Sequence, residues 1–244
     1  MDLELSGKSV LVTGGSSGIG EQVATRFAEM GAQVAINSAS SVEAGEDVAA
    51  RLGGIYCRAD IADDGAVRAM IEEVVSVFGG LDVVVNNAGR TRVIPHDDLD
   101  AVTDEVWTEI LGVNLLGTWH VTRAAVPHLK ESRNGSVINV SSLAGLRPVG
   151  SSVPYAVSKA GLNHMTRLLA RVLGPKIRVN AVAPGLVNTP WTKDWMEVRR
   201  LVGEITPMRS EAMPDDVAEA CLYLAHSTFV TGDVLAVDGG HQLV

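Results

Sequence analysis

A tyrosine and a lysine spaced four residues apart are the pair in this sequence best suited to chemistry. In the segment Tyr-Ala-Val-Ser-Lys, Tyr155 and Lys159 would share one face of a helix. A cation beside a phenol favours the phenolate, so Lys159 is expected to lower the pKa of Tyr155 from about 10. Lowering that pKa by roughly three brings the phenol toward neutrality, as a general acid/base requires. The pair therefore predicts proton transfer at a carbonyl oxygen.

A serine upstream of this pair supplies a second polar group. Ser142 stands at the end of an apolar run, residues 136–141, that is typical of a buried strand. In open α/β folds, ligands bind at the carboxyl edge of the sheet, so this hydroxyl could hydrogen-bond a substrate carbonyl oxygen. A Tyr-x-x-x-Lys pair found alone is usually an ordinary surface pair on a helix. The catalytic interpretation depends on combining the pair with Ser142 and with a glycine-rich turn.

That turn is Thr-Gly-Gly-Ser-Ser-Gly-Ile-Gly at residues 13–20. A predicted strand ends at Thr13 and a predicted helix starts at Ile19, with glycines between them that let the backbone approach a pyrophosphate. The helix N-terminus adds amides and partial positive charge. A second predicted strand begins at residue 33, which is the context that a dinucleotide site requires. The alternative, a turn without function, would cost backbone entropy for no gain.

The end of the second predicted strand bears on the choice of cofactor. It reads Ile-Asn-Ser-Ala-Ser-Ser at residues 36–41, and the first carboxylate after it is Glu43. A site for unphosphorylated ribose usually has Asp or Glu here, whereas one for a 2′-phosphate usually has a basic residue. Neither stands in this stretch, although serine hydroxyls could hydrogen-bond the phosphate. We expect NADP rather than NAD, with NAD left open; the serines could equally serve only to cap the next helix.

Short apolar runs alternate with longer helical patterns along the chain. This alternation predicts a parallel sheet with helices on both faces, and right-handed crossovers make it a doubly wound (Rossmann) α/β fold. We expect residues 1–244 to form a single domain. The predicted strands are residues 9–13, 33–37, 55–58, 81–86, 136–141, 177–182 and 234–237. The predicted helices are residues 19–30, 41–52, 63–78, 103–130 (as one helix or two), 154–173 and 215–225.

Composition excludes several classes of partner. The chain is 46 % hydrophobic and 20 % charged, which is typical of a globular protein. Its formal net charge of −9 would repel nucleic acid and anionic membranes. Neither the two cysteines, Cys57 and Cys221, nor the histidines show metal-ligand spacing, so no metal is expected. The N-terminal residues have no signal-peptide pattern, and no apolar stretch is long enough to span a membrane; we expect a cytoplasmic protein.

With these motifs in order, the chain resembles the short-chain dehydrogenase/reductase family over essentially its whole length. It is similar to the compact single-domain branch, including the 3-oxoacyl-carrier-protein reductases. Asn-Asn-Ala-Gly at 86–89 and Val-Asp-Gly-Gly at 237–240 also match the family. The resemblance implies a catalytic tetrad of Asn114, Ser142, Tyr155 and Lys159. In that tetrad Asn114 holds a water-mediated proton relay to Lys159, which also binds the nicotinamide ribose.

The resemblance also implies which residues bind the cofactor. Asp60 would contact adenine, and the segment from Pro184 to Thr189 would hold the carboxamide end of the nicotinamide. The chain departs from the family at Ser38, where members that favour NAD have aspartate. It also lacks the basic residue that members favouring NADP have near Ser17 or Ala39. The implied set is Gly14, Ser16, Ser17, Gly18, Ile19, Gly20, Asn37, Ser38, Asp60, Ile61, Asn87, Ala88, Gly89, Tyr155, Lys159, Pro184, Gly185, Val187 and Thr189.

The least regular stretch, residues 185–214, is rich in Trp, Met, Pro and charge and is too long for an ordinary connection. The resemblance implies that it covers the substrate, and Trp191, Trp195 and Met196 favour an apolar or aromatic substrate portion.

The sequence also offers candidate contacts with charged substrates and with partners. Arg90 and Arg92 could bind an anionic substrate, or they could be ordinary exposed arginines. Family members that reduce acyl chains on a carrier protein dock it with basic residues in the regions of Arg133 and Lys176, so the resemblance implies a carrier protein as one candidate partner. The family forms tetramers and dimers through its long helices, so a homo-oligomer is expected.

The predicted function is hydride transfer between a nicotinamide cofactor and a carbonyl or secondary alcohol carbon, with Tyr155 as the general acid/base. The substrate could be a 3-oxoacyl thioester or a steroid, sugar, polyol or xenobiotic ketone. One alternative is a non-catalytic dinucleotide-binding redox sensor or scaffold, which would not need an intact tetrad. Another is a lyase or epimerase that oxidises its substrate transiently and retains its cofactor.

Overall fold

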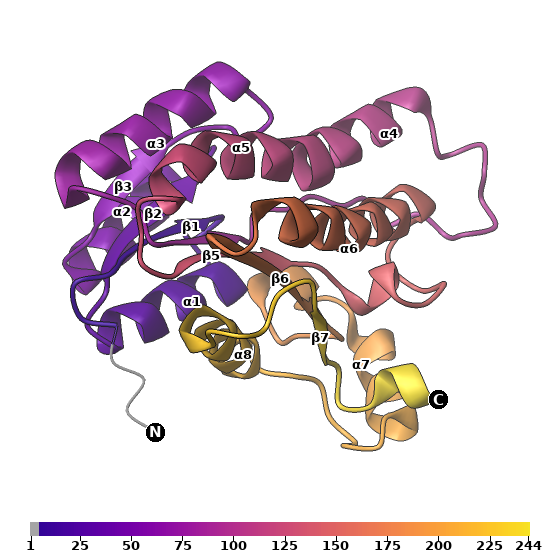
Figure 1. Ribbon diagram of the computed structural model, residues 1–244. Helices are drawn as coiled ribbons and strands as arrows, with labels where there is room; N and C mark the ends of the chain where they lie inside the picture. Colours follow the sequence, from indigo (N-terminus) through magenta and orange to yellow (C-terminus); the bar gives the residue numbers. More distant parts are fainter. Residues whose placement is uncertain (1–4) are drawn as a thin grey trace.

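The chain forms one parallel sheet of seven strands in the order β3-β2-β1-β4-β5-β6-β7 (Figure 1). The computed structural model describes residues 5–244. Strand order reverses between β1 and β4, which makes the crevice above their carboxyl ends the expected ligand site. The predicted doubly wound fold is confirmed. The strands are β1 (Ser9–Thr13), β2 (Gln33–Ser38), β3 (Ile55–Arg58), β4 (Val83–Asn86), β5 (Gly135–Val140), β6 (Ile177–Pro184) and β7 (Val234–Val237).

Helices cover both faces of the sheet, in two layers (Figure 1). Side chains alternate between the faces along each strand: Val10 and Val12 of β1 pack on one side and Leu11 on the other. This double burial explains why the strands are continuous apolar runs. One layer contains α1 (Gly18–Glu29), α2 (Val42–Leu52) and α8 (Pro214–His226); the other contains α3 (Asp64–Phe78), α5 (Thr118–Leu129) and α6 (Val153–Leu173). No helix within residues 5–244 is long and apolar enough to cross a lipid bilayer.

The segment predicted as one or two helices over 103–130 contains a π-helical turn. Helix α4 (Asp104–Leu111) runs into this turn at Gly112–Gly117, and α5 follows without a break. A Cβ on Gly117 would lie 2.7 Å from the Ile61 side chain, so a glycine is needed where the turn approaches the segment after β3. Asn114 lies within the turn and is buried. π-Helical turns inside α-helices often occur at functional sites.

Two other elements differ from the sequence-based expectation. Strand β5 ends at Val140, so Ser142 does not end the strand; it caps a short 3-10 helix, Leu143–Gly145, and its Oγ accepts a hydrogen bond from the Ala144 amide (3.1 Å). The stretch 185–214 is not uniformly irregular, because it contains α7 (Met196–Ile205). Only Val202 of this helix is buried; its other apolar side chains, Met196, Val198, Leu201 and Ile205, are exposed.

Candidate active site

The glycine-rich turn forms a backbone cradle between β1 and α1. Gly14 and Gly18 have φ of +63° and +58°, which side-chain-bearing residues rarely adopt. A Cβ on Gly20 would lie 2.2 Å from the carbonyl oxygen of Gly14, and one on Gly14 would lie 2.8 Å from Ala88 Cα. Because glycines carry no side chain, the backbone packs tightly here and the amides at the start of α1 are not covered, so a phosphate can reach them. The cradle therefore fits the pyrophosphate of a dinucleotide.

The Asn-Asn-Ala-Gly segment after β4 supports this cradle. The side-chain amide of Asn87 donates to the carbonyl oxygens of Thr13 and Gly14, both at 3.0 Å. In return, the Thr13 hydroxyl accepts from the backbone amides of Asn87 and Ala88, both at 3.1 Å. These four bonds fix the ends of β1 and β4 to each other at the point where the strand order reverses.

A cavity of about 1160 Å³ extends from the glycine turn to α7. It brings together predicted residues from segments far apart in the sequence, and it places the glycine turn in the same space as Ser142, Tyr155 and Lys159. Its lining includes these predicted residues: Gly14, Ser16, Ser17, Gly18, Ile19, Asn87, Ala88, Gly89, Ser142, Tyr155, Lys159, Pro184, Gly185, Val187 and Thr189. Gly20, Asn37, Ser38, Asp60, Ile61 and Asn114 are not part of this lining.

Several of the residues outside the cavity use their side chains within the fold. The buried Asn37 side chain donates to the carbonyl oxygens of Cys57 (3.1 Å) and Ala59 (3.0 Å), which joins the end of β2 to β3. Ile61 is buried against the π-helical turn. Asp60 is exposed, and its carboxylate accepts from the Ala62 amide at 2.9 Å. The backbone carbonyls of Asn37 and Ile61 also have partners: the Gly15 amide donates to that of Asn37 (3.0 Å), and a ring nitrogen of His120 lies 3.1 Å from that of Ile61.

Tyr155 and Lys159 lie on the first two turns of α6, as their spacing predicts. Ser152 caps this helix, its hydroxyl accepting from the Tyr155 amide at 3.4 Å. The ammonium of Lys159 lies 5.8 Å from the centre of the Tyr155 ring and donates to the carbonyl oxygen of Val140 at 2.8 Å. Lys159 is only 4 % exposed. Strand β5 and helix α6 thus position the pair together.

The pKa of Tyr155 does not follow the sequence-based expectation. Burial raises this pKa above its ordinary value, and the Ser142 hydroxyl acts more weakly in the opposite direction. Burial also lowers the pKa of Lys159 to about 8. The expected lowering of the phenol pKa by the lysine is not seen, since the ammonium is directed at the Val140 carbonyl. Tyr155 is therefore a protonated phenol at neutral pH, the form that can donate a proton to a ketone oxygen.

The lowered pKa of Lys159 gives the protein a measurable pH dependence. Between the folded pKa of about 8 and the ordinary 10.5, the unfolded chain binds more protons, so stability rises with pH through this window. We expect the unfolding free energy of the cofactor-free protein to gain up to about 3 kcal/mol relative to Lys159→Met from pH 7 to pH 10. Denaturant unfolding of both proteins at each pH measures this. A difference that stays constant or narrows would contradict the assignment.

Asn114 connects the π-helical turn to the rest of the site. Its side-chain oxygen accepts from the Arg90 amide (2.7 Å), and its nitrogen donates to the Arg90 carbonyl (3.0 Å) and to the Ser158 hydroxyl (2.9 Å). These contacts anchor the turn after β4 against α6. A Cβ on Gly89 would lie 3.5 Å from the Asn114 oxygen and 3.8 Å from the Lys159 ammonium, so the two polar groups flank the same glycine.

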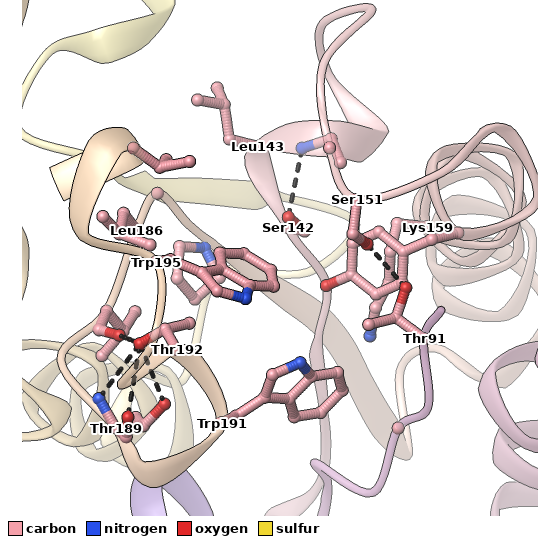
Figure 2. A pocket seen from close by; sticks show the side chains of 18 of the residues that line it. Thr91, Ser142, Leu143, Ser151, Lys159, Leu186, Thr189, Trp191, Thr192 and Trp195 are labelled. Carbon is pink, nitrogen blue, oxygen red and sulfur yellow. Dashed lines mark hydrogen bonds between the residues drawn. The ribbon is translucent and has the colours of Figure 1, made fainter. Parts of the chain in front are cut away.

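Apolar and aromatic side chains wall the end of the cavity beyond Ser142. The indoles of Trp191 and Trp195 point into the cavity, toward the side that carries Ser142 and Lys159 (Figure 2). Leu143 and Leu186 are part of the same wall. A hydrogen bond between the hydroxyls of Thr91 and Ser151 (2.6 Å) joins the two loops on the opposite side of the cavity (Figure 2). This geometry can hold an apolar group beside Ser142, Tyr155 and Lys159.

An arginine that the sequence analysis missed holds the tryptophan-bearing segment in place. Arg199 of α7 forms an ion pair with Glu211 (3.2 Å) and donates to the carbonyl oxygen of Thr192 (3.2 Å). The Thr192 hydroxyl donates in turn to the carbonyl of Val187 at 2.6 Å. Nothing in the residue types marked this network, because the pairing joins positions on either side of a loop.

The two arginines considered for an anionic substrate have a partner within the chain. Arg90 and Arg92 form ion pairs with the carboxylate of Glu109 on α4, at 3.0 Å and 2.7 Å. Their side chains are exposed, at 56 % and 57 %. Neither arginine lines the cavity, and both are paired with Glu109. Of the two interpretations, that of ordinary exposed arginines therefore fits better than that of a site for an anionic substrate.

Known proteins resemble this chain over nearly its full length. A family model described as "Enoyl-(Acyl carrier protein) reductase" matches residues 14–242. A granaticin polyketide synthase putative ketoacyl reductase from Streptomyces violaceoruber is 56 % identical, over 96 % of each chain. A (2S)-[(R)-hydroxy(phenyl)methyl]succinyl-CoA dehydrogenase subunit from Thauera aromatica is 40 % identical, over 98 % of each chain.

Solved structures agree with these sequence relatives. The crystal structure of a 3-ketoacyl-(acyl-carrier-protein) reductase from Brucella melitensis complexed with NADH superposes with a TM-score of 0.91. It is 36 % identical, over 98 % of this chain and 99 % of that one. Shared fold, shared sequence and a cavity that joins a dinucleotide cradle to a serine, a tyrosine and a lysine lead to one conclusion. The chain belongs to the short-chain dehydrogenase/reductase family and is an NAD(P)-dependent oxidoreductase that acts on carbonyl and alcohol groups.

Proposed function

We propose that this enzyme reduces the ketone of a 3-oxoacyl thioester whose acyl chain carries an aromatic or other bulky apolar group. The observation that carries this proposal is the pair of indoles, Trp191 and Trp195, facing the polar side of the cavity (Figure 2). Planar aromatic side chains favour stacking with planar apolar substrates. The names of the ketoacyl reductase from Streptomyces and of the phenyl-bearing CoA-ester dehydrogenase from Thauera support the same substrate class.

The catalytic roles follow from the geometry of three side chains. When bound, the nicotinamide supplies the hydride that the ketone carbon accepts. Ser142 donates a hydrogen bond to the ketone oxygen, where negative charge develops. Tyr155 gives its phenolic proton to that oxygen, so that C=O becomes CH–OH. Lys159 binds the nicotinamide ribose, and its charge stabilises the phenolate that remains.

Asn114 and the remaining predicted residues complete the proposed site. Asn114 places Gly89 and the turn after β4 beside Lys159, a position suited to a water-mediated relay that returns the proton to Tyr155. The glycine turn would hold the pyrophosphate, and residues 184–189 would hold the nicotinamide. Asn37, Ser38, Asp60 and Ile61 would hold the adenosine. Residues 185–214 would cover the substrate.

We further propose that residues 1–244 form a single domain that works in the cytoplasm as a homotetramer or homodimer. The long helices expose apolar side chains that would be covered in such an assembly. Leu116 in the π-helical turn is 53 % exposed, and Leu168 and Val172 on α6 are 52 % and 69 % exposed. Size-exclusion chromatography with light scattering measures the oligomeric state directly.

A substrate panel tests the proposed reaction. Purified enzyme and NADPH are mixed with a phenyl-substituted 3-oxoacyl thioester, a short 3-oxoacyl thioester, the matching 2-enoyl thioester, a sugar and a simple cyclic ketone. We expect the highest kcat/KM with the aromatic 3-oxoacyl thioester. Preference for the enoyl thioester or the sugar would contradict the proposal. Tight NADPH binding without turnover of any compound would instead favour the redox-sensor alternative.

The two indoles should discriminate between substrates. Trp191→Ala and Trp195→Ala are each expected to raise KM for the aromatic thioester by about tenfold, which corresponds to about 1.4 kcal/mol and lies within the range for stacking on an aromatic ring. KM for the short thioester should change less than threefold. Trp119→Ala is the matched control, because that indole lies under Arg123 on α5 and is not part of the cavity lining. Equal losses for both thioesters would contradict the assigned contact.

A further inference from the structure

We propose that Arg58 binds the 2′-phosphate of NADPH and gives the enzyme its preference for the phosphorylated cofactor. This inference rests on the assignment of the chain as an NAD(P)-dependent enzyme. The family pattern offers no basic residue at the positions near Ser17 or Ala39 where one usually stands. The structure supplies a cation to the same place from the next strand.

Strand register places Arg58 beside the end of β2. In the parallel pair β2–β3, Ser38 lies opposite Arg58. Side chains two residues apart on a strand share a face, so Arg58 lies on the same face as Tyr56. The Tyr56 hydroxyl is 2.9 Å from the Ser38 hydroxyl, which puts Ser38 on that face too. Ser38 and Arg58 therefore leave the carboxyl edge of the sheet together, on the side covered by α2.

The guanidinium of Arg58 lies against the turn between β2 and α2. Its Nε donates to the carbonyl oxygen of Ala39 at 3.3 Å, and the side chain is exposed. Within residues 5–244, no carboxylate lies within 4.0 Å of it. Neighbouring arginines differ: Arg51 on α2 is paired with Glu21 at 2.6 Å, and Arg26 on α1 with Glu29 at 3.3 Å. Arg58 is thus a cation with its remaining nitrogens available.

In doubly wound folds the adenosine ribose of a dinucleotide binds at this turn, so this is where it would lie here. With the pyrophosphate on the N-terminus of α1, the ribose reaches the end of β2, where an acid binds its 2′-hydroxyl or a nearby arginine accepts its 2′-phosphate. Here the acid is replaced by Ser38, whose hydroxyl is committed to Tyr56 and to the Ser41 carbonyl (3.1 Å). The planar guanidinium fork suits a phosphate dianion.

Other groups at the turn are compatible with a phosphate. Ser40 and Ser41 are exposed, and Ser41 precedes α2 without its side chain forming a capping bond. Helix α2 begins at Val42, so its first amides add partial positive charge to the same turn. Glu43 is the nearest acid along the chain and lies in the first turn of α2. A sequence search for a basic residue after β2 misses Arg58 because it comes from β3.

Direct binding measurements test this role without a substrate. NADPH and NADH are each titrated into the wild type, Arg58→Gln, Arg58→Lys and the control Arg51→Gln, with nicotinamide fluorescence as the readout. We expect Arg58→Gln to raise Kd for NADPH by about 10- to 100-fold, as for loss of a hydrogen-bonded charge. Kd for NADH should change less than twofold. Arg58→Lys should fall between, and Arg51→Gln should leave both values within twofold.

Three outcomes would overturn the inference: an unchanged NADPH Kd in Arg58→Gln, equal weakening of NADPH and NADH, or a wild type that prefers NADH. The salt dependence of NADPH binding provides a second check, because Arg58→Gln should flatten it and Arg51→Gln should not. Failure of the proposed reaction can be distinguished from failure of the Arg58 inference. An enzyme that binds NADPH through Arg58 but turns over no 3-oxoacyl thioester contradicts the substrate assignment alone.

Discussion

Replacing Tyr155 by phenylalanine is expected to lower kcat for the 3-oxoacyl thioester by about a thousandfold, within the range for loss of a general acid. The phenol is the proposed proton donor in the cavity, and burial raises its pKa further above neutrality. Phenylalanine keeps the ring, so the wall of the cavity and the packing of α6 should persist. Steady-state kinetics give kcat, and titration with NADPH should give a Kd within threefold of the wild type.

Tyr223→Phe is the matched control for this substitution. It removes the same hydroxyl from a residue on α8 that is 47 % exposed and is not part of the cavity lining. Its kcat should equal that of the wild type. A Tyr155→Phe enzyme with kcat within twofold of the wild type would contradict the role of the phenol. Loss of NADPH binding in that variant would show instead that the phenolic hydroxyl is needed for cofactor binding.

Replacing Gly20 by alanine is expected to destroy cofactor binding and to destabilise the fold by about 3 kcal/mol. The added Cβ would lie 2.2 Å from the Gly14 carbonyl oxygen and 2.4 Å from the Asn87 side-chain nitrogen. Neither atom can move freely, because Asn87 also bonds to Thr13. Overpacking of this kind usually costs 1–3 kcal/mol, and here it falls on backbone. Denaturant unfolding measures the stability, and NADPH fluorescence measures the binding.

Gly80→Ala serves as the control, since nothing lies within 4 Å of a Cβ at that position and its backbone is not in the left-handed region. This variant should bind NADPH as the wild type does and unfold within about 0.5 kcal/mol of it, as surface substitutions usually do. Normal NADPH affinity in Gly20→Ala would show that α1 can move away from the glycine turn, contrary to the tight geometry described.

The sheet could be predicted from sequence because it is buried on both faces. Double burial makes each strand a short, continuous apolar run, and glycine-rich or polar segments separate these runs clearly. Strand ends were less predictable: β5 stops at Val140, and Ser141 and Ser142 lead into the 3-10 helix Leu143–Gly145, which Ser142 caps. The π-helical turn at Gly112–Gly117 packs closely against Ile61, a long-range contact that no local pattern reveals.

The residues of the candidate site could be predicted from the sequence, but the pKa values of its side chains could not. Helical spacing alone brings Tyr155 and Lys159 together. The direction of the Tyr155 pKa could not be foreseen, because it depends on burial and on the Val140 carbonyl that takes the lysine's hydrogen bond. Helix α7 was missed because it is amphipathic over only ten residues and lies mostly at the surface. Arg58 was missed because only strand pairing places it beside Ser38.

The central claim is that a hydride from nicotinamide C4 and a proton from Tyr155 convert a ketone into an alcohol within this cavity. The most direct test uses NADPH with deuterium in place of both hydrogens at C4, with a phenyl-substituted 3-oxoacyl thioester, and mass spectrometry of the product. The account predicts one deuterium on the carbinol carbon for each NADPH oxidised, and almost no product from Tyr155→Phe. Alcohol formed without deuterium, or at an equal rate by both proteins, would contradict it.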